Sequence, residues 1–194
     1  MNMRNVNIVA RHESKLLRRD IVFLGFVVIA LVGISLWQMI KQGRVNVFWY
    51  KVALPSSFPF FSMYYYNLVQ VLIALFVCME VVYRERKKDA MEVFLCRPFR
   101  NSEYCIGRFL GIFRMFLFVN ICVLLVCMYI NLWVVGAPFN VWIYVFYLFT
   151  LSIPTLIFVL GCALSISAMV KNRPLSVLVL GLFGLGVYFY LDEW

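Results

Sequence analysis

The chain has 194 residues, of which 64% are hydrophobic and only 14% are charged, and its mean hydropathy is +0.90. Soluble domains carry about 45–50% apolar and about 25% charged residues, so this composition excludes an ordinary soluble protein. The net charge of +9 does not indicate nucleic-acid binding, because the basic residues gather at the ends of apolar runs, as membrane topology requires. The pattern predicts an all-α polytopic membrane protein.

Residues 1–20 are too polar and too basic to be a cleavable signal peptide. Within them, apolar residues such as Val9 and Leu17 alternate with arginines and lysines. This alternation predicts an amphipathic helix that lies along the cytoplasmic membrane interface. A solvated basic tail is the alternative, because the apolar face is narrow.

Apolar runs after this helix predict a single transmembrane domain. Its spans are expected at about 21–40, 64–83, 109–133, 143–169 and 174–191. Pro154 should bend the fourth span, because a proline removes one backbone donor and clashes with the preceding turn. Since these five spans leave residue 194 across the membrane from the N-terminus, we expect a further span to be missing from the sequence.

The lysines and arginines predict the orientation. The chain has 18 of them, and with the N-terminus inside only Lys41, Arg44 and Lys51 fall outside. Aromatic residues such as Trp142 gather at the predicted outer interface, where amphipathic rings prefer to lie. We therefore expect a bacterial cytoplasmic (inner) membrane protein with a cytoplasmic N-terminus and with residue 194 on the outer side.

Small residues at four-residue spacing are expected to let the helices approach closely. The pairs are Gly161 with Ser165 and Ala163 with Ser167, and further small residues are Gly181, Gly184 and Gly186. Polar residues within the spans are few, which is typical of a route for a lipid-like or amphipathic substrate. They are Asn67, Gln70, Asn120 and Asn131.

Glu80 is the only acidic residue inside a predicted span. An intramembrane acid is a candidate for a functional site, here a proton relay. The alternative is structural, because Glu80 lies one turn from Arg84 and either reaches the interface or pairs there.

The segment 84–102 is the one strongly charged interruption between apolar runs. Residues 84–96 read as a helix with apolar residues on one face, and Pro98 ends it. Exposed Met91, Phe94 and Leu95 would be poorly placed in water, so the segment is expected to meet a partner or the lipid surface. A basic loop that serves topology alone is the alternative.

The run ERKKDAMEVFLCRPFRNSEYCIGRFLG, residues 85–111, resembles the cytoplasmic coupling segment of type 2 ABC exporter membrane subunits. Arg108 stands where that family usually has lysine, and Asp89 with Ala90 stand where it often has Gly-Thr. The family normally has six spans, which truncation of this chain would explain. The residues that fit the family pattern are Glu85, Arg86, Met91, Glu92, Val93, Leu95, Pro98, Glu103 and Gly107.

The resemblance implies a permease subunit of an exporter. A separate cytosolic ATP-binding cassette subunit would receive the 84–97 helix in a groove, with Phe94, Leu95 and Met91 as apolar anchors, Glu92 on the rim and Pro98 at the corner. The permease would pair with a second copy or with a homologous subunit. ATP would bind to the partner, and this chain, which has no Walker-type loop, would hold no cofactor.

Two other function classes remain open: a multi-pass membrane enzyme and a membrane assembly factor without transport activity. An enzyme needs a nucleophile with a base, paired acids or metal ligands at a common depth. The sequence indicates no such catalytic set. It also indicates no metal site, because His12 has no partner ligand nearby and the six cysteines, which form no CxxC pair, read as free thiols.

Overall fold

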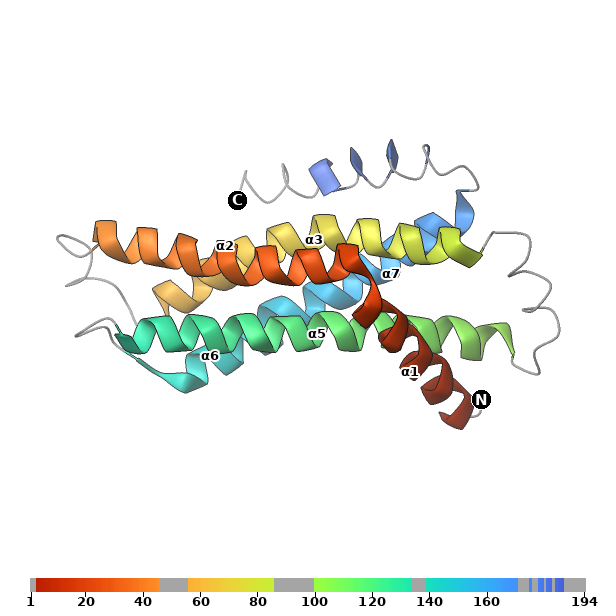
Figure 1. The fold of residues 1–194 in the computed structure, drawn as a ribbon, viewed down its shortest axis with the longest axis horizontal. Coiled ribbons are helices and arrows are strands. Elements are labelled where there is room, and N and C mark those ends of the chain that lie inside the picture. Colours follow the sequence, from red (N-terminus) through yellow and green to blue (C-terminus); the bar gives the residue numbers. More distant parts are fainter. Residues whose placement is uncertain are drawn as a thin grey trace. The chain divides into compact units, whose positions relative to one another are not determined.

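The computed structural model describes residues 3–45, 56–85, 100–133 and 139–170, together with residues 175, 178–179, 181–182 and 184–186. The elements of the described residues are helices and include no strand, which confirms the all-α class (Figure 1). They are α1 (Met3–Arg19), α2 (Ile21–Val45), α3 (Ser57–Glu85), α5 (Asn101–Trp133), α6 (Val141–Tyr147), the π-helical turn η1 (Leu148–Ser152) and α7 (Ile153–Met169).

Four stretches are long and apolar enough to cross a membrane, and they coincide with the first four predicted spans. They are Ile21–Gln38, Phe58–Tyr83, Asn101–Trp133 and Val141–Met169. Two helices begin earlier than their predicted spans, α3 at Ser57 and α5 at Asn101, because a helix continues beyond the width of the hydrocarbon. Most of the predicted fifth span, 174–191, lies outside the described residues.

The chain divides into two compact units, and α3 and α5 contribute to both. Unit 1 comprises residues 1–20, 70–115 and 156–194, and unit 2 comprises residues 21–69 and 116–155.

In unit 1, α1 packs against the first part of α5 (Figure 1). Its buried residues recur every three or four positions and form one stripe: Val6, Val9, Ala10, Glu13 and Leu17. Residues 3–19 are therefore a helix with one buried stripe. Sequence reasoning predicted the helix but not its position on α5.

In unit 2, aromatic rings fill the space beside α2. The Phe116 ring of α5 lies 5.5 Å from the Phe23 ring and 5.9 Å from the Phe26 ring, between centroids. On the other part of α2, the Trp37 ring meets the Tyr65 ring of α3 edge-on at 4.8 Å. These edge and tilted geometries are those that aromatic pairs prefer.

The contacts inside unit 2 also show the directions of its helices. Phe23 of α2 meets Phe116 of α5, and further along both helices Gln38 meets Cys127, so α2 and α5 run in the same direction. The Phe60–Tyr147 and Asn67–Ser152 contacts show the same for α3 and the α6–η1 segment. A chain that crosses a membrane repeatedly reverses direction at each crossing, so its first and third spans run in one direction and its second and fourth in the other.

The small residues predicted to mediate packing differ in their surroundings. Ala163 and Ser167 are buried, as expected of packing positions. A Cβ on Gly161 would meet no atom of the described residues within 4 Å, and Ser165 is exposed, so that pair does not pack within the described chain. Gly184 does pack, because a Cβ there would lie 3.2 Å from the Leu75 side chain.

Candidate functional site

The beginning of α5 contains three residues of the predicted coupling segment: Glu103, Gly107 and Arg108. Glu103 lies in the first turn, where a carboxylate is favourable to the positive end of the helix dipole. It is buried and accepts a hydrogen bond from Asn5 Nδ2 of α1 at 3.1 Å. Arg108 is also buried, and its guanidinium carbon lies 6.0 Å from the centre of the Tyr104 ring.

Gly107 and Gly111 form the seat for α1. A Cβ on Gly107 would lie 2.8 Å from the Val6 carbonyl oxygen, and one on Gly111 would lie 2.8 Å from the Ala10 carbonyl oxygen. The two glycines are four residues apart, the spacing that lets two helix backbones approach closely. Gly107 was singled out in the sequence only by family resemblance, and its role in this structure is helix packing.

Two further hydrogen bonds fix α1 along α5. Ser14 Oγ donates to the Gly111 carbonyl oxygen at 3.0 Å, and Arg114 Nη1 donates to Asn7 Oδ1 at 3.0 Å. The amino-terminal helix and the start of α5 are therefore on the same side of unit 1.

The other predicted coupling residues cannot be placed in the same way. Met91, Glu92, Phe94, Leu95 and Pro98 lie outside the described residues. The backbone of Glu85 is the last residue of α3, while its side chain is not described. Glu80 is half-buried on α3, one turn and a residue before that end.

Unit 2 contains a second candidate site, a set of four buried amide side chains that we call the amide core: Gln38, Asn67, Asn120 and Asn131. Gln38 lies on α2, Asn67 on α3, and Asn120 and Asn131 on α5. Asn120 and Asn131 are eleven residues apart, three helical turns, so they lie on one face of α5 about 16 Å apart along its axis.

Each amide nitrogen in this core donates to a protein acceptor. Gln38 Nε2 donates to the Cys127 carbonyl oxygen at 3.2 Å, and Asn120 Nδ2 donates to the Phe116 carbonyl oxygen at 2.9 Å. Asn131 Nδ2 donates to the hydroxyl oxygen of buried Tyr144 at 2.8 Å.

Asn67 connects α3 with the π-helical turn. Its Nδ2 donates to the Met63 carbonyl oxygen at 2.8 Å and to Ser152 Oγ at 3.1 Å. Ser152 is the last residue of η1 and is fully buried, and Pro154 follows two residues later. Single π turns inside α-helices occur frequently at functional sites, and a proline is one of the known causes of local irregularity. The sequence predicted a bend at Pro154 but not this turn or its contact.

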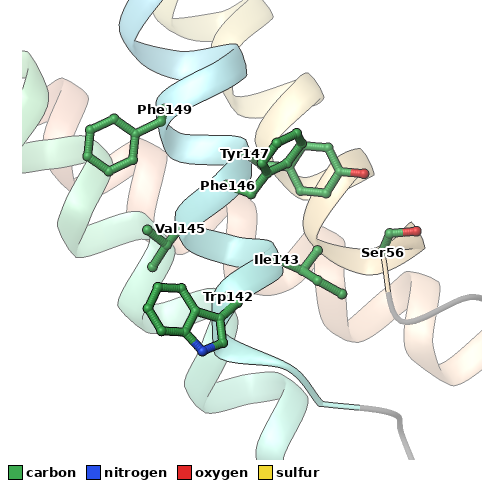
Figure 2. A pocket seen from close by; sticks show the side chains of 7 residues that line it. All are labelled: Ser56, Trp142, Ile143, Val145, Phe146, Tyr147 and Phe149. Carbon is green, nitrogen blue, oxygen red and sulfur yellow. The ribbon is translucent and has the colours of Figure 1, made fainter.

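An open hollow of about 610 Å³ lies around α6. Figure 2 shows that most of its lining side chains come from α6 and the following π-helical turn, and that Ser56 comes from a separate segment of the chain. Trp142, Phe146 and Phe149 are largely exposed, and the lining offers no acidic or basic group. An apolar, aromatic surface of this kind suits lipid contact better than chemistry. The lining residues are Ser56, Trp142, Ile143, Val145, Phe146, Tyr147 and Phe149.

Within the described residues, no three histidine, cysteine or acidic side chains come together as a group that could hold a metal ion. Comparison with protein-family models, characterised proteins and solved structures gives no match to this chain. The geometry of the α1–α5 seat and of the amide core is therefore the basis for assigning a function.

Proposed function

We propose that this chain is the membrane-spanning permease subunit of an ABC exporter, coupled to a separate cytosolic ATPase. The observation that carries the proposal is the seat of α1 on Gly107 and Gly111, at the point where the family-like segment 85–111 enters α5. Four candidate membrane spans and a core with polar side chains support the same reading.

The seat gives the coupling segment a stiff connection to the membrane domain. Residues 86–100 join the end of α3 to the start of α5, and α1 is fixed to α5 by contacts at Glu103, Gly107, Gly111 and Arg114. When the ATPase moves the segment, α5 and α1 move as one body. Because α1 is packed along the start of α5, a displacement of that end of α5 is passed along the helix into the membrane and is not absorbed by bending at its start.

The basic face of α1 suits a cytoplasmic membrane surface. Five cationic side chains are exposed on the helix whose apolar stripe is buried on α5: Arg4, Arg11, Lys15, Arg18 and Arg19. Each basic residue near an anionic bilayer surface contributes about 1 kcal/mol of attraction. The headgroups would hold α1, and with it the start of α5, at the inner leaflet.

The test is capture of the ATPase by the full chain in native membranes. Phe94→Asp and Leu95→Asp, which place a charge on the apolar face of the segment, should reduce co-purification of the ATPase at least tenfold while leaving membrane insertion unchanged. Ser165→Ala, at an exposed residue of α7 outside the segment 84–102, is the control and should retain capture. Unchanged capture by both aspartate variants would rule out the coupling role. Catalytic activity of the purified chain without nucleotide or partner would favour a membrane enzyme.

A further inference from the structure

The exposed side of α1 is basic, and three of its cations lie in one sector of the helix. Successive residues of an α-helix are about 100° apart, so Arg11, Lys15 and Arg18 project within about 60° of one another. This sector faces away from the buried stripe of α1, and all three side chains are exposed. Residues three and four positions apart are neighbours on a helix surface, and like charges at that spacing repel each other.

Arg114 of α5 adds a fourth cation beside this row. Its Nη1 donates to Asn7 Oδ1 of α1 at 3.0 Å, and Asn7 lies one turn before Arg11 on the helix surface. The bond therefore brings the exposed guanidinium of Arg114 close to Arg11, although the two residues belong to different helices. Because the Asn7 amide is neutral, this bond does not offset the charge of Arg114. We call Arg11, Lys15, Arg18 and Arg114 the basic patch.

None of the acidic side chains that the structure describes in unit 1 is exposed. They are Glu13 and Glu103, which are buried, and Asp20 and Glu80, which are half-buried. Glu103 contacts α1 through Asn5, which projects about 160° away from Asn7, so the Glu103 and Arg114 contacts lie on opposite sides of α1. A surface that gathers cations and lacks exposed acids attracts an anionic partner.

The patch lies at the depth of the lipid headgroups when α5 spans a membrane. The helix α5 has 33 residues and is about 50 Å long, which exceeds the roughly 30 Å of bilayer hydrocarbon. Its charged residues end at Arg114, and residues 115–133, about 28 Å of helix, carry no charged side chain. The hydrocarbon therefore matches residues 115–133 and leaves Arg114, with the part of α1 bonded to it, at its edge.

Exposed apolar side chains border the patch on the side away from Arg114. Ile8 is 50% exposed and Leu16 is 41% exposed, and both project between the cations and the buried stripe of α1. Cations beside exposed apolar residues are typical of helices that lie in the membrane interface, where headgroups meet the cations and the acyl boundary takes up the apolar groups. This composition favours a lipid surface over a nucleic acid or an acidic protein.

We propose that the basic patch binds the phosphate groups of anionic phospholipids and that these lipids hold α1 on α5. Arg11 and Arg114 come from the two helices, so a phosphate bound to both bridges the seat and offsets the repulsion between their like charges. This inference goes beyond the proposed function, because the lipid becomes part of the contact between two helices and no ATPase is required. The anionic lipid content of the membrane then regulates how firmly α1 holds the start of α5.

The first experiment measures which lipids the full chain retains when it is released, in native mass spectrometry, from micelles with equal amounts of phosphatidylglycerol and phosphatidylcholine. The two lipids carry the same tails and differ in headgroup charge. We expect phosphatidylglycerol to be retained at least about fivefold over phosphatidylcholine, the factor that one cation near an anionic surface supplies. Equal retention overturns the proposal, and this comparison needs no variant.

Variants then locate the surface. The combined change Arg11→Gln, Lys15→Gln and Arg18→Gln should abolish the preference for phosphatidylglycerol, because it removes three of the four charges. The matched control, Arg11→Lys with Arg18→Lys, keeps every charge and should retain the preference. Arg114 is left unchanged in both, since its bond to Asn7 belongs to the seat. A preference that survives in the glutamine variant shows that the lipids bind elsewhere.

Hydrogen exchange tests the effect on the seat, because exchange of α1 amides reports local opening of that helix. In nanodiscs that contain phosphatidylglycerol, the amides of residues 6–19 should exchange at least about fivefold more slowly than in pure phosphatidylcholine, the same factor as for binding. The amides of residues 71–82 of α3 are the internal control and should exchange equally in both. Equal exchange of α1 in the two lipids refutes the bridging role.

This inference and the proposed function can fail separately. If the glutamine variant loses ATPase capture while its lipid preference is unchanged, the patch docks a protein and the lipid assignment is wrong. A lipid preference that requires the patch, in a chain that captures no ATPase, refutes the coupled transporter and supports the lipid surface.

Discussion

Replacing Gly107 with alanine places one carbon atom in the seat of α1. That Cβ would lie 2.7 Å from Val9 Cβ and 2.8 Å from the Val6 carbonyl oxygen, whereas ordinary contact begins at 3.4 Å. Neither atom lies at the end of a flexible side chain, so the clash is relieved only if α1 itself moves away from α5 by about half an ångström or more. A gap of that size loses about a quarter to a half of the dispersion energy between the two helices at this contact.

The expected loss follows from two opposing terms. Alanine favours a helix over glycine by about 1 kcal/mol, while overpacking a close contact costs about 1–3 kcal/mol. Gly33→Ala is the control, because a Cβ there meets no described atom within 4 Å and only the favourable term applies. The free energy of unfolding of Gly107→Ala should therefore fall below that of Gly33→Ala by about 1–3 kcal/mol, the cost of the clash.

Reversible unfolding in mixed micelles, followed by circular dichroism, measures this difference. A second comparison uses a chain without residues 1–19, in which Gly107→Ala should lose its penalty because α1 is gone. If Gly107→Ala is as stable as Gly33→Ala in the full chain, α1 does not pack on α5 through this seat, and the support for the coupling role falls with it.

Further predictions concern the π turn and the orientation. A double-mutant cycle of Asn67→Leu with Ser152→Ala should give a coupling energy of about 0.6 kcal/mol and at most about 1.7 kcal/mol, the range of hydrogen bonds between membrane helices; additive effects would mean that the bond does not form. In a Pro154→Ala background the same coupling should fall towards zero, because a regular helix would turn Ser152 away; an unchanged value would show that the proline does not maintain the π turn. In a Cys96→Ser background, a membrane-impermeant maleimide should label exposed Cys105 in inside-out vesicles and not in right-side-out vesicles; the reverse result would invert the topology.

The membrane spans could be predicted because they depend on composition, which is a local property. Four predicted spans match helices that are long and apolar enough to cross a membrane. The amphipathic helix at the N-terminus was also predictable, since the alternation of Val9 and Leu17 with basic residues requires no knowledge of the rest of the chain.

The partners of these helices could not be predicted, because packing depends on which faces meet. Gly107–Gly111 and Gly161–Ser165 have the same spacing, yet the first pair lies against α1, whereas a Cβ on Gly161 would meet no described atom within 4 Å. Spacing shows that a close approach is possible and does not show where a partner lies.

The amide core illustrates the same limit for chemistry. The sequence shows that Asn67, Asn120 and Asn131 are polar residues in apolar spans. Only the structure shows that each of these nitrogens donates to a protein acceptor while each carbonyl oxygen is buried without a donor among the described residues. Gln38 lies near the end of the predicted span 21–40, where a polar residue is ordinary, so the sequence did not indicate that its side chain is buried.

The hydrogen bond from Asn5 to Glu103 joins residues 98 positions apart, and this separation has a consequence for biogenesis. At about 5–20 residues per second, the ribosome needs about 5–20 seconds after making α1 to complete the surface on which it rests. During that interval the nascent chain already has two hydrophobic helices in the translocon, while the stripe of Val6, Val9 and Leu17 has no protein to cover it. The lipid surface must shelter those side chains until α5 arrives, so a bulky fusion or an early-acting chaperone at the N-terminus would disturb assembly before it disturbed the finished protein.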